Sequence, residues 1–347
     1  MSPPALVTLV GGAVLVLGAA VWLLVWIVGF MVGLFLDHPI VILRLEPEES
    51  GAEPGMRDPD VHFLGRDGTK LRGWLVRSPQ PTRRVIAFFH EYGADAGAWS
   101  RYLSFLPAEG FHVFTFDFRG AGESEAPKGY RPFKWATAGE VADADAALCY
   151  LRAKAEEEGW EVAAFGASRG ASALMMAAAG HPWLQTIACE GMSSTLGSIH
   201  SYMRRWARIY IPDAIVEWTP DAVWRMFAHL VVVASENREG VRFPPLEWHL
   251  AQLQGRRILF IYGERDALIT PQHRDGILRG YRGPRALWML PRTGHLAGPV
   301  QFAAEYRHRV TAWFLGEMAP RVLPSEDRSS VLGSRPSVEQ RNPAAVA

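Results

Sequence analysis

The chain has 347 residues, of which 49% are hydrophobic, so it is long enough for one large domain with a sizeable core and additional segments. Basic and acidic residues both number 36, so the net charge is zero and no general attraction to nucleic acid is expected. Cys149 and Cys189 fall in a predicted helix and a predicted strand. They are expected to be core residues rather than a disulfide pair.

A charge-free segment lies at the start of the chain. Residues 5–36 carry no charged side chain. As a helix rising about 1.5 Å per residue, this segment exceeds the roughly 30 Å hydrocarbon core, so residues 1–37 are predicted to form a transmembrane anchor. Trp22, Trp26 and Phe30 fall on one helical face and suit the interfacial end. A cleaved signal peptide is less favoured, because no Lys or Arg precedes the segment and its apolar stretch is too long.

The flanks of this segment and the end of the chain have different compositions. Arg44 and Arg57 follow the span and no basic residue precedes it, which weakly favours a single-pass protein with its following domain in the cytoplasm. Residues 38–60 are rich in Glu, Pro and Gly and are predicted to form a linker. Residues 318–347 are rich in Pro and Ser without periodicity, and are predicted to form a disordered tail.

Strands and helices alternate between these ends. A hairpin is predicted where residues 61–64 and 71–76 flank Asp67-Gly68. Further strands are predicted at 84–90, 111–116, 161–165, 185–189, 257–262 and 286–290, and a helix at 138–157. This order predicts an α/β fold, in which a mostly parallel sheet has helices on both faces and is preceded by the antiparallel hairpin.

A long insertion interrupts the alternation. More than sixty residues separate the strands at 185–189 and 257–262, so residues 193–240 are predicted to form a helical cap on a core of residues 61–192 and 241–317. Six apolar residues of the cap share one helical face: Ile199, Tyr202, Met203, Trp206, Ile209 and Tyr210. This face could pack on the core, or it could lie on lipid with Arg204, Arg205 and Arg208 at phosphate headgroups.

The segment Gly166-Ala167-Ser168-Arg169-Gly170 lies between a predicted strand and the predicted helix at 171–179. Gly-x-Ser-x-Gly in this context describes a nucleophile elbow, where flanking glycines permit a turn tight enough to expose the serine hydroxyl. The competing interpretation is an unreactive Gly-rich turn. A nucleophilic serine also requires a base and a group that orients that base.

Two later strands supply candidates for those partners. Asp266 follows the strand at 257–262, and His295 follows the strand at 286–290. Because ligands of open α/β sheets bind at the carboxyl ends of the strands, Ser168, Asp266 and His295 are predicted to meet there. Asp266 could instead cap the helix that begins near Thr270, His295 could be a surface residue, and Glu190 is an alternative acid.

Residues 61–316, about three quarters of the chain, resemble the α/β-hydrolase superfamily, in which Ser, Asp and His occur in this order. His90-Glu91-Tyr92-Gly93 is similar to its His-Gly loop after the third strand. Residues 117–124, Asp-Phe-Arg-Gly-Ala-Gly-Glu-Ser, are similar to its Asp-x-Arg-Gly-x-Gly-x-Ser loop after the fourth. With its single span, the chain looks like membrane hydrolases of the serine-aminopeptidase-like type.

The resemblance also implies an oxyanion hole formed by the backbone N–H groups of Tyr92 and Arg169. Glu91 occupies a position where the family usually has glycine. Its side chain is expected to bond local backbone, with substrate or a nearby arginine as the alternative partner. His90, Arg119 and Ser124 are expected to hold their loops together rather than to take part in catalysis.

These residues predict a membrane-anchored serine hydrolase that cleaves carboxylic esters, small or lipid-like, through an acyl-enzyme. An amidase or aminopeptidase, an acyltransferase, and an inactive membrane interaction module are the alternatives. No metal or nucleotide cofactor is expected, because the sequence shows neither metal-ligand spacing nor a complete dinucleotide motif. Membrane lipids around residues 5–36 are the other expected partners.

Overall fold

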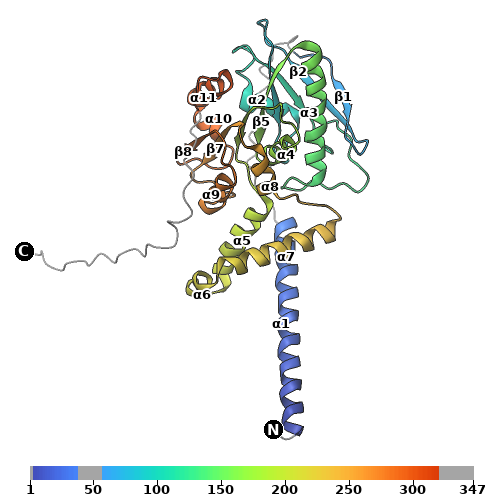
Figure 1. Ribbon diagram of the computed structural model, residues 1–347, viewed down its shortest axis with the longest axis vertical. Helices are drawn as coiled ribbons and strands as arrows, with labels where there is room; N and C mark the ends of the chain where they lie inside the picture. Colours follow the sequence, from blue (N-terminus) through green and yellow to red (C-terminus); the bar gives the residue numbers. More distant parts are fainter. Residues whose placement is uncertain (1–2, 38–56, 320–347) are drawn as a thin grey trace, which may run out of the picture.

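An eight-stranded sheet lies at the centre of residues 57–319, which the computed structural model describes together with residues 3–37 (Figure 1). The strands lie in the order β1-β2-β4-β3-β5-β6-β7-β8. Their bounds are β1 Val61–Leu64, β2 Lys70–Val76, β3 Arg84–Phe89, β4 His112–Phe116, β5 Glu161–Ala167, β6 Thr186–Glu190, β7 Arg257–Gly263 and β8 Arg285–Leu290. The β1–β2 and β2–β4 pairs are antiparallel and the others are parallel, which confirms the predicted mixed sheet.

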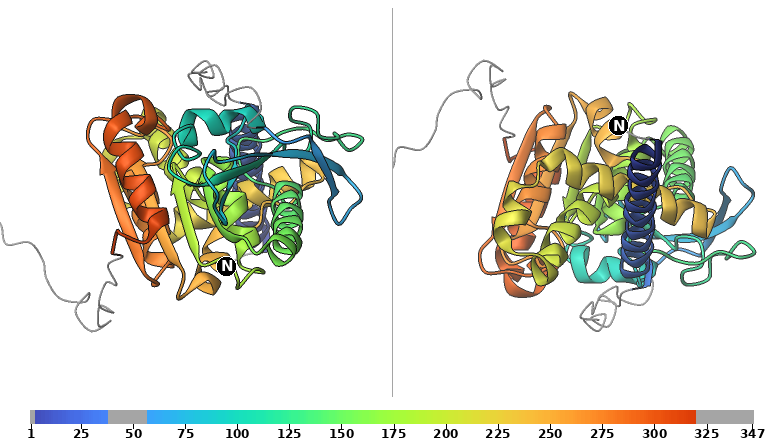
Figure 2. Two further views of the ribbon diagram at one scale, coloured as in Figure 1. Left: turned by 90° about the horizontal axis from the view of Figure 1, so that it is seen from above. Right: turned by 90° about the horizontal axis from the view of Figure 1, so that it is seen from below.

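Helices cover both faces of this sheet (Figure 2). One face packs against α3 (Ala138–Glu158), α4 (Arg169–Ala178), α8 (Leu246–Leu250) and α9 (Pro271–Gly280). The other packs against α2 (Trp99–Leu103) and α11 (Ala303–Leu315), and α10 (Gly298–Gln301) contacts α11. Side chains of a strand alternate between the faces, so Ala87 and Phe89 lie in the first core whereas Ile86 and Phe88 lie in the second.

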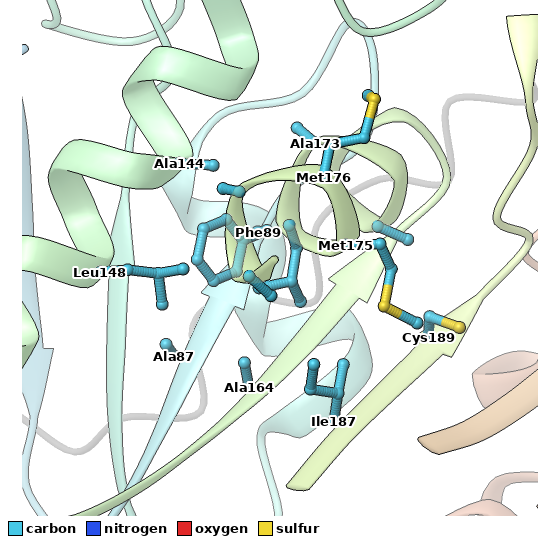
Figure 3. Packing of buried hydrophobic residues seen from close by; sticks show 14 of the residues in the cluster. Ala87, Phe89, Ala144, Leu148, Ala164, Ala173, Met175, Met176, Ile187 and Cys189 are labelled. Atoms are coloured by element: carbon cyan, nitrogen blue, oxygen red, sulfur yellow. The ribbon is translucent and has the colours of Figure 1, made fainter. Parts of the chain in front are cut away.

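Small residues bring α4 close to the sheet. In Figure 3, Ala173 and Met175 of α4 lie above Phe89, Ala164 and Ile187 of three neighbouring strands. Ala144 and Leu148 of α3 close the same cluster on one side. Because α4 starts directly after β5, this packing fixes the position of the turn between them, which contains Ser168.

Three helices form the insertion after β6: α5 (Thr195–Tyr210), α6 (Asp213–Trp218) and α7 (Asp221–Glu239). They lie at the end of the molecule where α1 (Pro3–Asp37) approaches it, and α7 crosses α1 (Figures 1 and 2). The part of α1 from Val10 to Asp37 is long and apolar enough to cross a membrane, a criterion that a signal sequence also meets.

The end of α1 packs against the cap. Met31, Val32, Phe35 and Leu36 of α1 are buried in a cluster with side chains of α5 and α7 and of the loop before α3. The Phe35 ring stacks on Trp135 with 4.0 Å between centroids. Asp37 pairs with Arg131 and Arg238. The helix α1 therefore contacts the domain directly.

The predicted linker and tail fall mostly outside the described residues, which leave out 38–56 and 320–347. Residues 57–60, at the end of the predicted linker, are described and contact the sheet. Arg57 forms a β-bridge with Val76, and the Asp58 N–H donates to the Leu75 carbonyl, so this segment extends the edge of the sheet.

Candidate active site

Ser168 occupies a strained turn between β5 and α4. Its backbone has φ 47° and ψ −116°, in a region that side-chain-bearing residues rarely adopt. The two glycines of the motif are required by close packing. A Cβ at Gly166 would lie 2.4 Å from Ala171 Cα, and one at Gly170 would lie 2.3 Å from the Phe89 carbonyl oxygen. A hydrogen bond to the end of β6 also holds the turn, because the Ser168 N–H donates to the Glu190 carbonyl at 2.8 Å.

The structure brings Ser168, His295 and Asp266 together. Ser168 Oγ lies 2.9 Å from His295 Nε2, and His295 Nδ1 lies 2.7 Å from Asp266 Oδ2. The Asp266 carboxylate is almost fully buried, so it accepts the Nδ1 proton in an environment of low dielectric. This arrangement leaves the Nε2 lone pair directed at the serine hydroxyl, as general-base activation requires.

The loop after β7 fixes the Asp266 side chain. Its second oxygen, Oδ1, accepts from the backbone N–H groups of Leu268 and Ile269 at 2.8 and 3.0 Å. The alternative role of Asp266 as a helix cap is wrong. Thr270 is the N-cap of α9, and its hydroxyl accepts from the His273 N–H.

Glu190, the alternative acid, has other partners. Its carboxyl oxygens accept from the Gly298 N–H at 3.0 Å and from the Tyr306 hydroxyl at 2.8 Å. Burial raises the pKa of Glu190 to about 7, although these hydrogen bonds oppose the rise. Glu190 thus joins the end of β6 to α10 and α11, whereas His295 Nδ1 is bonded to Asp266.

The residues expected to form an oxyanion hole border the same site. Arg169 is the first residue of α4, and the N–H groups of the first helical turn have no acceptor within the helix. Tyr92 lines the cavity that also contains Ser168 and His295. The loop carrying Tyr92 begins against the elbow, because the Phe89 and His90 carbonyls approach Gly170. The Arg169 guanidinium stacks over the Tyr92 ring at 5.4 Å.

The Glu91 carboxyl interacts with its own backbone N–H, as expected, and also has the alternative partner, a nearby arginine. Its Oε1 accepts from Arg101 Nη1 of α2 at 2.6 Å, and both side chains are largely buried. Burial raises the pKa of Glu91, and the positive charge of Arg101 opposes that rise. The pair connects the Tyr92 loop to the helix that follows it.

The loops after β3 and β4 are held by His90, Arg119 and Ser124, as expected. His90 Nε2 accepts from the Phe118 N–H and its Nδ1 donates to the Glu91 carbonyl, and burial lowers the pKa of His90 to about 3. Arg119 pairs with Asp143 at 2.6 Å, and Ser124 Oγ donates to the Asp117 carbonyl. A neutral His90 is therefore a structural link between two loops.

The cavity at Ser168 is narrow in this conformation. Its volume is about 30 Å³, whereas small-molecule sites usually measure roughly 300–1,000 Å³. The cap contributes Tyr202, the loop after β7 contributes Leu268 and Ile269, and the loop before α3 contributes Lys134 and Trp135. The sequence analysis did not identify Lys134 or Trp135, because neither belongs to a motif or a periodic segment.

A group of three side chains away from this cavity could bind a metal ion by residue type and proximity: Asp145, Cys149 and His181. Asp145 and His181 already have protein partners. His181 Nε2 bonds Asp145 at 2.9 Å, its Nδ1 accepts from Trp183, and Arg66 pairs with the other Asp145 oxygen. The contacts are sufficient to explain the group as a surface network between α3 and the loop after α4.

Comparisons with known proteins agree with this architecture. A family model described as serine aminopeptidase, S33, matches residues 80–234, which include Ser168. The uncharacterized protein YfhR of Salmonella typhi is 31% identical over 245 residues, covering 60% of this chain and 80% of its own length. YfhR of Escherichia coli K12 is 26% identical over 267 residues, covering 75% of this chain and 82% of its own length.

Solved structures share the fold at lower identity. An esterase from Pyrococcus furiosus has a TM-score of 0.55 at 19% identity, covering 82% of this chain and 97% of its own. Acetyl xylan esterase 1 from Thermoanaerobacterium has a TM-score of 0.52 at 15% identity, covering 83% of this chain and 92% of its own. Together with the sheet order, the elbow and the relationship to YfhR, these findings show that the chain belongs to the α/β-hydrolase superfamily.

Proposed function

We propose that this protein is a membrane-anchored serine hydrolase that cleaves carboxylic esters through an acyl-enzyme. The observation that carries the proposal is the continuous hydrogen-bonded series from Ser168 through His295 to Asp266, with distances of 2.9 and 2.7 Å. The strained Ser168 backbone supports it, because such strain is kept where a side chain must be held in one exposed position.

The reaction follows from this geometry. Ser168 Oγ attacks the ester carbonyl carbon while His295 Nε2 takes the hydroxyl proton, and Asp266 stabilises the resulting imidazolium. The N–H groups of Arg169 and Tyr92 hold the negative oxygen of the tetrahedral intermediate, where one donor is worth about 3 kcal/mol. The intermediate collapses, and the leaving alkoxide takes the proton from His295. Water, deprotonated by His295, then attacks the acyl carbon and releases the acid and Ser168.

Labelling with a fluorophosphonate probe tests the nucleophile. The wild-type chain is expected to be labelled, because an activated serine attacks phosphorus, and Ser168→Ala is expected to remove the label completely. Ser193→Ala is the matched control, since Ser193 lines the same cavity without contacting His295 in any described hydrogen bond, and it is expected to be labelled normally. Labelling that survives in Ser168→Ala contradicts the proposal.

Amide cleavage is a second candidate, favoured by the description of the matching family model as a serine aminopeptidase. The same three side chains can cleave either bond. A matched pair of short-chain ester and aminoacyl amide separates the two, measured as kcat/KM on the purified full chain. We expect the ester to be hydrolysed and the amide to be a poor substrate. Faster hydrolysis of the amide would replace the esterase proposal with an amidase.

A further inference from the structure

The cap helices carry several large apolar side chains that are exposed. On α7, Met226, Leu230 and Val233 are exposed and recur at intervals of four and three, opposite the buried Trp224, Ala228 and Val231. The exposed apolar residues of the cap are Ile209, Tyr210, Ile211, Ile215, Trp218, Met226, Leu230 and Val233, and we call them the cap underside. Trp218 is 88% exposed, which is unusual for the largest apolar side chain.

The length of α1 places this surface at one boundary of a bilayer. A helix of 35 residues is about 52 Å long, and roughly 20 residues are enough to cross the 30 Å hydrocarbon layer. Contact with the cap begins near Ile27, and the last turns of α1 are buried by the cap. The earlier part of the helix, from Val10 to Trp26, is exposed apart from the half-buried Leu24. This exposed part is about 26 Å long, close to the thickness of the hydrocarbon layer, so the cap begins near the level of the lipid headgroups.

The aromatic residues of α1 lie at the same boundary between the hydrocarbon layer and the headgroups. Trp26 and Phe30 stack with 5.8 Å between ring centroids, one turn before the buried contact with the cap. Aromatic rings of this kind gather at the headgroup region of membrane proteins. The α6 and α7 helices lie on the side of the domain that faces the N-terminal part of α1 (Figure 1). The helices that carry the cap underside therefore lie next to the bilayer through which α1 would pass.

The charges of the cap argue against binding through anionic headgroups. Residues 195–240 contain five arginines and five acidic residues, so their net charge is zero. Arg204 and Arg225 lie near Asp221, and Arg208 lies between Asp213 and Glu217. Arginines neutralised in this way leave apolar contact as the main attraction to lipid.

We infer that the cap underside is a membrane-docking surface, which inserts Trp218 and Met226 into the interfacial layer of the leaflet that meets the cap. The partner is the neutral lipid surface itself. The inference rests on the part of the proposed function that places α1 across a bilayer. It also gives the cap a role in substrate access, because Tyr202 and Trp135 line the catalytic cavity and Trp135 stacks on Phe35 of the anchor.

Depth-dependent fluorescence quenching tests this inference on the full chain. Cys149 is exposed, contrary to the expectation for it, whereas Cys189 is buried as expected. Variants with a single exposed cysteine are therefore made in a Cys149→Ser background. A polarity-sensitive fluorophore is attached at Trp218→Cys or Met226→Cys, and at the controls Leu64→Cys and Val300→Cys. Both control positions are exposed apolar residues outside the cap and α1. The proteins are placed in phosphatidylcholine nanodiscs with and without lipid that carries a nitroxide near the top of the acyl chain.

The labels at residues 218 and 226 are expected to be quenched at least about twofold more than those at 64 and 300, with blue-shifted emission. A label at Leu17→Cys, an exposed position near the middle of the span, reports separately on α1 in nanodiscs whose lipid carries the nitroxide near the end of the acyl chain. Quenching at residue 17 with none at 218 and 226 overturns the docking surface but leaves the anchor intact. No quenching at residue 17 overturns the transmembrane part of the proposed function and the docking surface with it.

Discussion

At the scale of single residues, the site depends on positions that have no reactive side chain. Gly166 and Gly170 let α4 approach β5 and the Phe89 carbonyl closely, and this approach holds Ser168 at φ 47°. The presence of a charged side chain at Glu91 is likewise explained by a neighbouring residue. A glutamate in place of glycine is accommodated because Arg101, ten residues later on α2, lies within 2.6 Å of it.

Gly170→Ala is expected to destabilise the chain by about 3 kcal/mol, because the new methyl would overlap the Phe89 and His90 carbonyl oxygens. It is also expected to abolish labelling by the fluorophosphonate probe, since the elbow would have to open. Thermal unfolding and labelling measure the two effects. Gly180→Ala is the control, because a Cβ there lies 3.6 Å from its nearest neighbour. Equal behaviour of the two variants would show that the elbow tolerates a side chain.

The three catalytic candidates could be predicted from the sequence because each follows a strand with a clear apolar run, and parallel strands end at one edge. The sequence analysis offered an arginine as one alternative partner for Glu91, but it could not identify that arginine as Arg101. A charged pair between a loop and a five-residue helix leaves no periodic signal, and α2 itself is too short to show one.

At the scale of elements, Glu190 links the end of β6 to the C-terminal helices through Gly298 and Tyr306. Burial raises the pKa of Glu190 from 4.5 to about 7 in the folded chain. Between these values the folded chain holds a proton that the unfolded chain has released. This proton stabilises the folded chain relative to the unfolded chain. The stabilisation is fully present below about pH 4.5 and is lost as the pH rises through 7.

Replacing Glu190 with glutamine is expected to remove this loss. The amide can still accept from Gly298 and can donate to the Tyr306 oxygen, and it does not ionise. Between pH 5 and 8 the wild-type chain is expected to lose about 3 kcal/mol more stability than Glu190→Gln. Melting temperatures in detergent at both pH values measure the difference. Glu161→Gln, at an exposed position that starts β5, should behave like the wild type. A Glu190→Gln variant as pH-dependent as the wild type would contradict the assignment.

The strands were predicted to within one or two residues, because continuous apolar runs bounded by turn residues are a strong local signal. The helix α11 was not predicted, although its buried residues Tyr306, Val310 and Trp313 have helical spacing. Arg307, Arg309 and the neighbouring polar residues dilute that pattern. The sequence analysis therefore left the second face of the sheet without its main helix.

At the scale of the whole molecule, the sequence predicted an anchor and a domain joined by a linker, but not their contact. The helix α1 is apolar on all sides, so no stripe of residues distinguishes the face that meets the cap from the faces left exposed. The contact depends on Phe133, Trp135 and Phe243, which come from loops without periodicity. Such packing becomes visible only when the fold has placed these residues together.

The packing of Phe35 on Trp135 also limits how the domain can turn. A domain on a free tether would tumble above a membrane and present its cavity in all directions. Here, two helical turns of α1 are embedded in the cap, and Asp37 pairs with two arginines, so rotation of the domain about α1 is restricted. In a bilayer, the cavity that contains Ser168 would thus keep a fixed orientation relative to the membrane plane. Encounters with substrates diffusing in that plane would then be a two-dimensional search, with a high effective concentration of correctly oriented collisions.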